Sequence, residues 1–223
     1  MFRQRTKRMN DMVKTKRRFA TTLKMAAAAG VVAIGSLAAS VAAASDDIAR
    51  SIADHFSSVK TMTGEFVQFG PKGQQIGGKF FIERPGKLRF NYEDPSPVRV
   101  ISDGKSVVIG NRELKTWDIY PLSKTPLKLL LGERIDLGGA MVKSVNVDTD
   151  LTTVVLGDRS IFGNSTITMM FDTETYDLRQ WTITDSQGKD TTVMIFEVQT
   201  GVRFADSVFE VPYNEVYASR GDR

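Results

Sequence analysis

The spacing of hydrophobic residues changes along this chain, from a helical period in its first third to a two-residue period after Met62. Four apolar residues recur at helical spacing: Ile48, Ile52, Phe56 and Val59. This pattern predicts one amphipathic helix over 45–62, with Ser45 as its N-cap. A helix with a single apolar stripe needs an apolar surface to cover.

After this helix, apolar and polar residues alternate in short runs separated by turn signals such as Arg84-Pro85-Gly86 and Asp103-Gly104. The runs predict strands at 62–69, 77–84, 87–93, 98–103, 105–110, 114–120, 143–148, 151–157, 164–172, 178–185 and 190–199. Short, evenly spaced strands joined by tight turns indicate an antiparallel meander. We therefore expect a mainly β fold, an incomplete antiparallel barrel, with few helices.

One leucine-rich segment, 121–141, interrupts the strands. It is too apolar for an ordinary solvated loop, and it predicts one or two short helices laid over the sheet as a lid. Pro126, Gly132 and the pair Gly138-Gly139 bound it, so that it could move as a unit. The predicted lid residues are Leu127, Leu129, Leu130, Leu131 and Met141.

The turn Arg84-Pro85-Gly86 puts an arginine at the edge of an apolar sheet face, because Phe80, Ile82 and Arg84 fall on one side of their strand. A half-buried guanidinium needs hydrogen-bond acceptors. The same alternation predicts a larger apolar face made of Phe80, Ile82, Leu88, Phe90, Tyr92, Trp117, Ile119, Met169, Phe171, Trp181 and Ile183. This face is either sealed core or the wall of a cavity for an apolar ligand, and the leucine-rich segment and the arginine favour the cavity.

The first 44 residues have the composition of a secretory signal peptide. A basic start is followed by an alanine-rich run, and Ala42-Ala43-Ala44 suits cleavage near Ala44. We predict a signal peptide at 1–44, a carrier domain at 45–217 and a polar tail at 218–223, hence an exported, periplasmic protein. A retained membrane anchor is the alternative, and both the general and the twin-arginine export routes remain open.

Without the leader the net charge changes sign. The whole chain carries +4, whereas residues after 44 hold 21 basic and 25 acidic side chains, a net charge of −4. A mildly acidic domain without a lysine or arginine cluster gives no electrostatic basis for binding nucleic acid. The chain has no cysteine, so its core alone must hold the fold. We expect a monomer.

Residue types that carry catalysis are sparse. The single histidine, His55, falls on the predicted helix and is interpreted as a surface residue. The sequence has no nucleophile-elbow, phosphate-loop, dinucleotide or zinc-protease motif. We predict no enzyme activity, no cofactor and no metal site.

A resemblance to a known family rests on one motif around the arginine, Arg84-Pro85-Gly86-Lys87-Leu88-Arg89-Phe90-x-Tyr92-x-x-Pro95, followed by Ser102-Asp103-Gly104-Lys105. The motif resembles the signature of the periplasmic outer-membrane lipoprotein carrier family, the LolA type, and the resemblance covers about residues 46–213. It implies a half-barrel with a helical lid over a hydrophobic cavity. It also implies that Arg84 is the lid latch, donating hydrogen bonds to the backbone carbonyls of the lid.

The function implied by the resemblance is that of a periplasmic chaperone for acylated lipoproteins. Such carriers receive lipoproteins from an inner-membrane ABC-type release complex and escort their acyl chains towards the outer membrane, where a lipoprotein receptor would be a further partner. Val108 and Gly110 stand where the family shows aromatics, which predicts a smaller or differently shaped cavity wall. Alternatives are a lipid- or lipoprotein-sensing binding protein of the same fold, and an enzyme acting on a lipid or glycan.

Overall fold

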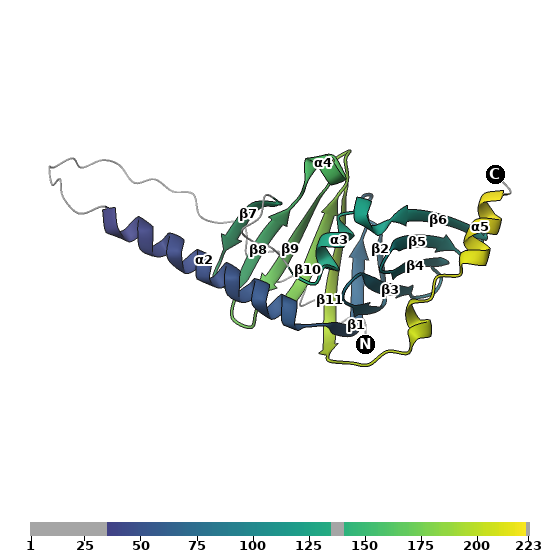
Figure 1. Cartoon of the computed structure of the whole chain (residues 1–223), viewed down its shortest axis with the longest axis horizontal. Helices are drawn as coiled ribbons and strands as arrows, with labels where there is room; N and C mark the ends of the chain where they lie inside the picture. The colour runs from purple at the N-terminus through teal and green to yellow at the C-terminus, as the bar shows by residue number, and fades with distance from the viewer. Residues whose placement is uncertain (1–34, 135–140, 222–223) are drawn as a thin grey trace. The chain divides into compact units, whose positions relative to one another are not determined.

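The computed structural model describes residues 35–134 and 141–221, and within them the chain is mainly β with a few helices (Figure 1). The strands are β1 (Thr61–Phe69), β2 (Gln75–Glu83), β3 (Lys87–Tyr92), β4 (Val98–Asp103), β5 (Ser106–Asn111), β6 (Thr116–Pro121), β7 (Val142–Val147), β8 (Leu151–Leu156), β9 (Thr166–Asp172), β10 (Leu178–Thr184) and β11 (Asp190–Thr200). The helices are α2 (Gly35–Ser58), η1 (Leu122–Lys124), α3 (Leu127–Leu130), α4 (Arg159–Phe162), η2 (Asp206–Phe209) and α5 (Tyr213–Gly221). Every predicted strand is present, with ends within two residues of those expected.

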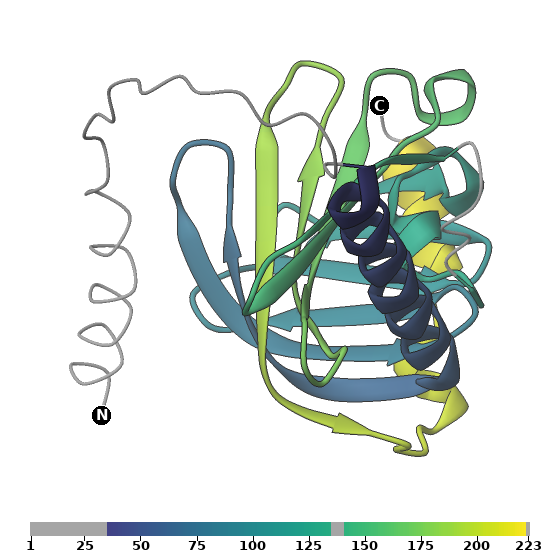
Figure 2. The ribbon, with the colours of Figure 1, turned by 90° about the vertical axis from the view of Figure 1, so that its left-hand side faces the viewer.

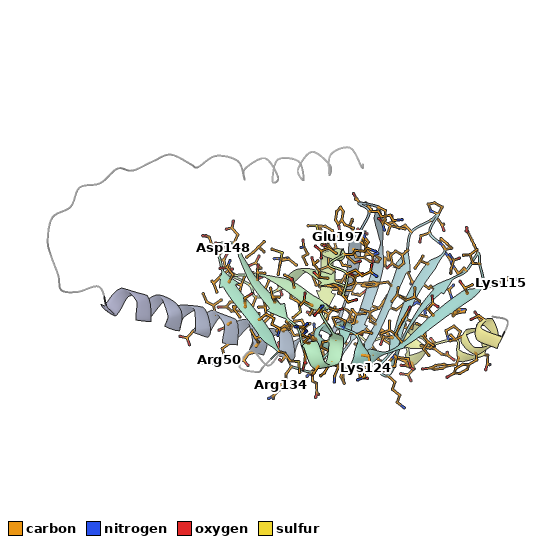
Figure 3. The ribbon with its side chains drawn as sticks, turned by 90° about the horizontal axis from the view of Figure 1, so that it is seen from above. Arg50, Lys115, Lys124, Arg134, Asp148 and Glu197 are labelled. Atoms are coloured by element: carbon orange, nitrogen blue, oxygen red, sulfur yellow. The ribbon has the colours of Figure 1, made fainter. Side chains whose placement is uncertain are left out.

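The strands form one 11-stranded antiparallel sheet in the order β6-β5-β4-β3-β2-β1-β11-β10-β9-β8-β7. Each strand neighbours the next along the chain except β6 and β7, and β1 pairs with β11 in the middle of the sheet. The sheet is open, because β6 and β7 end this order without pairing with each other. Lys115, in the β5–β6 turn, and Asp148, in the β7–β8 turn, mark its two opposite edges in Figure 3. The predicted half-barrel is confirmed as an open antiparallel sheet.

Helix α2 differs from its prediction at both ends. It begins at Gly35, so Ser45 lies inside the helix and does not cap it. The alanine-rich run continues the helix because alanine has the highest helix propensity. At the other end, Thr61 and Met62 pair with Glu83 and Ile82 of β2, and this sheet pairing ends the helix earlier than 62. Residues 1–34 of the predicted signal peptide lie outside the described residues. Among the described helices, none is long and apolar enough to cross a membrane.

The main hydrophobic core lies between one face of the sheet and a cover made of α2, η1 and α3 (Figures 1 and 2). From the cover, Ile52, Phe56, Leu122, Leu130 and Leu131 are buried in it. The sheet contributes apolar side chains from strands on both sides of β1. We call α2, η1 and α3, with Leu131 at the end of α3, the cover from here on, because they remove this face from solvent.

A second, smaller core lies on the opposite face of the sheet, under the C-terminal helix α5. It consists of Ile101, Val108, Trp117, Val211 and Val216. Strand β5 supplies Val107 to the main core and Val108 to the second one, so this part of the sheet is covered on both faces. Residues 218–221, predicted as the start of a polar tail, continue α5.

Candidate functional site

Arg84 directly follows β2 and is only 5% exposed. Its Nη1 donates hydrogen bonds to the backbone carbonyls of Phe56 and Val59, both at 2.6 Å. Its guanidinium also lies 3.5 Å above the centre of the Phe56 ring. The Phe56 carbonyl belongs to the last turn of α2 and the Val59 carbonyl directly follows the helix, where helical carbonyls lack partners and a positive charge is favourable. The arginine therefore caps α2 and holds it to the sheet.

The partner of Arg84 differs from the one predicted. We expected its side chain to bond the backbone of the leucine-rich segment 121–141, but in the described residues it bonds the end of α2 instead. The cause is the sheet register: Thr61 pairs with Glu83, which brings the chain after α2 beside Arg84. The backbone amide of Arg84 also donates to the Lys60 carbonyl, at 2.8 Å.

Backbone hydrogen bonds hold the leucine-rich segment to the turn 84–86 and to the neighbouring turn 103–105. The Gly86 amide donates to the Leu131 carbonyl, and the Leu122 amide donates to the Lys105 carbonyl, both at 2.8 Å. The cover is thus fastened by two neighbouring turns, 84–86 and 103–105. We call these two turns the clasp.

The two turns of the clasp are packed tightly against each other. The buried Ser102 hydroxyl donates to the Gly86 carbonyl at 2.7 Å. Gly86 has a φ of +84°, and a Cβ added to it would lie 2.6 Å from the Gly104 Cα. Only glycine fits this position, because both the backbone angle and the approach of Gly104 exclude a side chain.

The clasp is connected to α5 through a tyrosine. The Tyr213 hydroxyl donates to Oδ2 of Asp103 at 2.6 Å, while Oδ1 accepts from the amides of Lys105 and Ser106. Partial burial opposes ionisation of Asp103, but the Ser106 amide, the Tyr213 hydroxyl and the Lys105 amide together hold the pKa of the carboxyl below its usual range. The C-terminal helix is therefore tied to the turn that holds Leu122. Sequence reasoning included Asp103 in the family motif but did not find its partner, 110 residues away.

Burial also perturbs Arg84 itself. Desolvation lowers the pKa of Arg84 to about 10, so the group stays protonated at neutral pH. Two of its nitrogens, Nε and Nη2, are buried without a hydrogen-bond partner in the described structure. The site thus holds a charged side chain that is only partly satisfied.

Most of the side chains predicted to line a cavity lie together under the cover. Seven are buried in the main core, and Tyr92 and Ile183 pack against it at partial burial; the seven are Phe80, Ile82, Leu88, Phe90, Met169, Phe171 and Trp181. In this state they pack against the cover. Their role as the wall of a cargo cavity stays a prediction.

Trp117 and Ile119 were assigned to the wrong face. Both belong to the second core, under α5. Trp117 pairs with Gly110, which places it on the face of Val108, and a one-residue error in alternation moves a whole strand to the other side. Val108 and Gly110 consequently do not shape the main apolar face. A Cβ on Gly110 would lie 2.5 Å from the Trp117 ring, so the small residue there makes room for the indole.

The predicted lid residues sit at different depths. Leu130 and Leu131 are buried, with exposures of 0% and 1%, and Leu127 and Leu129 pack against the main core at partial burial. One or two short helices were expected in this segment, and the structure has two, η1 and α3. Met141 is half-buried, and its carbonyl accepts from Gly157. The predicted hinge residues Gly138 and Gly139 lie outside the described residues.

His55 is half-buried rather than a simple surface residue. Its Nε2 lies 3.0 Å from Oδ1 of Asp177, in the turn between β9 and β10. This contact fastens the C-terminal end of α2 to the other half of the sheet. The sequence carries no signal for it, because the two residues are 122 positions apart. Within the described part of the chain, no group of three or more histidines and acidic residues could hold a metal ion.

Solved structures with a similar fold include a LolA superfamily protein from Nitrosomonas europaea, 8% identical, with a TM-score of 0.42 over 74% of this chain and 98% of the other. Another is the complex of MucA and MucB from Pseudomonas aeruginosa, 12% identical, with a TM-score of 0.44 over 76% of this chain and 62% of the other. Because both scores are below 0.5, the family assignment rests on sequence.

Curated relatives named outer-membrane lipoprotein carrier protein match most of the chain. The protein from Methylobacillus flagellatus is 26% identical over 183 residues, which are 74% of this chain and 84% of the relative. The one from Pseudomonas putida is 25% identical over 194 residues, 79% of this chain and 88% of the relative. The family model described as outer membrane lipoprotein carrier protein LolA matches residues 57–212, a span that contains the clasp and the whole sheet. The chain belongs to the LolA family of outer membrane lipoprotein carrier proteins.

Proposed function

We propose that this protein is a periplasmic chaperone that binds the acyl chains of lipoproteins released from the inner membrane and carries them towards the outer membrane. The observation that carries the proposal is the cover. An extended apolar face of the sheet is closed by α2, η1 and α3, and polar bonds at the clasp fasten them. Such a face can be uncovered for a ligand without breaking the sheet.

The equilibrium between the covered and the uncovered form of the apolar sheet face then depends mainly on the polar bonds at the clasp. Acyl chains would replace cover side chains on the same face, at about 0.8 kcal/mol for each buried methylene. Hydrogen bonds to a charged group contribute about 1.5–3 kcal/mol each, and Arg84 makes two to α2. The clasp therefore opposes binding, which keeps cargo affinity low enough for cargo to be passed on.

The partners that follow are acylated lipoproteins, an inner-membrane ABC-type release complex and an outer-membrane lipoprotein receptor. Removal of residues 1–44 on export would leave the carrier domain in the periplasm. Carrying cargo in this way needs no chemical step and no cofactor.

The direct test is release from spheroplasts. Newly made lipoproteins are labelled, the purified protein lacking residues 1–44 is added outside, and the supernatant is assayed for lipoprotein. We expect ATP-dependent release of lipoprotein in complex with the protein. If no lipoprotein is released although a control carrier from another bacterium releases it, the carrier function is contradicted. That result would favour the alternative, a lipid- or lipoprotein-sensing protein.

The latch role of Arg84 has a matched control in Arg89. Both arginines donate Nη1 to backbone carbonyls, but Arg89 bonds Val208, in the segment after β11. Removing the two bonds of Arg84 favours the uncovered form, so Arg84→Leu should load cargo and pass it to acceptor membranes about tenfold more slowly or worse. Arg89→Leu should transfer at the wild-type rate. Equal transfer rates for Arg84→Leu and the wild type would exclude the latch role.

A further inference from the structure

The guanidinium of Arg84 uses only one of its three nitrogens for hydrogen bonds within the described structure. Nη1 bonds two carbonyls at the C-terminal end of α2, those of Phe56 and Val59, whereas Nε and Nη2 are buried and unpartnered. The side chain is 5% exposed, so solvent does not satisfy these donors. A buried, charged group with free donors is costly, and such groups in native proteins call for an explanation.

The two free nitrogens form one side of the planar guanidinium. The N–H bonds of Nε and Nη2 that share this side run nearly parallel, so that together they can receive two acceptor oxygens. The surroundings are apolar, because the ring of Phe56, a member of the main core, covers one face of the guanidinium. A group that satisfies this side of Arg84 must therefore combine oxygen acceptors with hydrocarbon.

We propose that the Nε–Nη2 side of Arg84 binds the carbonyl oxygens at the head of the cargo's acyl chains. The inference rests on the proposed function and adds a polar recognition point to an otherwise apolar site. An acyl group meets both requirements, because its carbonyl oxygen accepts hydrogen bonds while its chain enters the apolar face. Fatty esters and free fatty acids share this chemistry. Alkyl ethers of equal length present no carbonyl oxygen.

The test compares two synthetic lipopeptides that differ only in linkage, one with two ester-linked palmitoyl chains and one with two ether-linked hexadecyl chains. Their dissociation constants are measured by displacement of an apolar fluorescent dye from the wild-type protein. We expect the ester to bind about tenfold more tightly, because it alone satisfies buried charged donors. Equal affinities would overturn the inference, whereas failure of both ligands to bind would overturn the proposed function instead.

Variants connect this preference to Arg84. Removing Arg84 also loosens the cover, but this change affects both ligands equally and cancels in the ratio of their dissociation constants. The ratio should fall to about one in Arg84→Leu and remain near the wild-type value in Arg89→Leu. An unchanged ratio in a folded Arg84→Leu protein would contradict the assignment, and the wild-type comparison stands even if that variant does not fold.

A second pair of ligands separates the two sources of carbonyl oxygen. Palmitic acid and hexadecanol differ in their carboxylate but not in chain length. If the acid shows a preference that depends on Arg84 while the ester lipopeptide shows none, the site is one for free fatty acids, and the assignment to esterified cargo is wrong. A preference that depends on Arg84 for the ester supports the assignment.

Discussion

Arg84 and Gly86 hold different parts of the cover although they belong to the same turn. Arg84 uses its side chain to hold α2, and Gly86 uses its backbone amide to hold the leucine-rich segment at Leu131. The arginine must be long and charged to reach helical carbonyls, whereas the glycine must lack a side chain to lie against Gly104. One turn therefore contacts both parts of the cover.

Gly86→Ala should destabilise the closed form more than an ordinary glycine substitution. Its positive φ costs an alanine about 1 kcal/mol, and contact with Gly104 adds to this cost. Gly73→Ala is the matched control, because Gly73 has a φ of +79° with nothing within 4 Å of the added Cβ. Urea denaturation should show a larger loss for Gly86→Ala. If both variants lose the same free energy of unfolding, the close approach of Gly104 does not contribute to the cost of Gly86→Ala.

Among the elements, α5 has a role that its position at the end of the chain does not suggest. It covers the second core with Val216, which is 0% exposed, and it reaches the clasp through Tyr213 and Asp103. The strand pair β4–β5 is consequently held from both faces, by the cover on one and by α5 on the other. The stability of α5 and that of the clasp are therefore linked.

This link predicts an acid-sensitive contribution to stability. The pKa of Asp103 is lowered in the folded protein, so its ionised form stabilises the fold above the ordinary carboxyl pKa of about 3.9, and the contribution is lost as the pH falls through the lower folded value. Urea midpoints of the wild type and Asp103→Asn should differ at pH 7, and the difference should be smaller at pH 3. The same difference in urea midpoint at both pH values would show that ionisation of Asp103 does not contribute to stability.

Tyr213→Phe tests the same link from the helix side. The variant keeps the ring, which stacks on Tyr217 at 5.7 Å, and loses only the hydroxyl that donates to Asp103. We expect a loss of about 1.5–3 kcal/mol at pH 7, as for a hydrogen bond to a charged group, and less in acid. Retention of full stability at pH 7 would contradict the link between α5 and the clasp.

In the whole molecule, the sheet and the cover are fastened in different ways. The sheet is continuous across β1 and β11, whose pairing runs from Met62–Thr200 to Phe69–Thr192. The cover is fastened to it by a few polar bonds at the clasp and by the His55–Asp177 contact. Opening of the cover should therefore leave the sheet intact, as a carrier that reuses its binding face requires.

Hydrogen exchange with and without an acylated lipopeptide tests this division. Cargo binding should accelerate exchange of the Gly86 and Leu122 amides, which donate to the cover or belong to it. The amides of Phe66 and Ile195, at the centre of the β1–β11 pair, should stay protected. Faster exchange throughout the sheet would show that binding unfolds the protein rather than moving its cover.

The sequence by itself determined the strands, the presence of at least one short helix in the leucine-rich segment and the unusual position of Arg84. These features depend on local rules, because strand alternation, turn residues and helical spacing act over a few neighbouring residues. The two ends of α2 differ in this respect. Its start follows from the local helix propensity of alanine, whereas the pairing of Thr61 with Glu83, a tertiary contact, fixes its end.

Only the tertiary structure decided which face each strand presents and which groups meet across the fold. Trp117 and Ile119 belong to the second core because α5 packs on their face of the sheet. Alternation within β6 does not by itself show which face of the sheet these two residues occupy. The partner that Arg84, Asp103 and His55 each find in another element lies 25 or more residues away, and no local pattern encodes such distances. The sequence marked Arg84 as a charge in need of acceptors, and the sheet register chose the end of α2 to supply them.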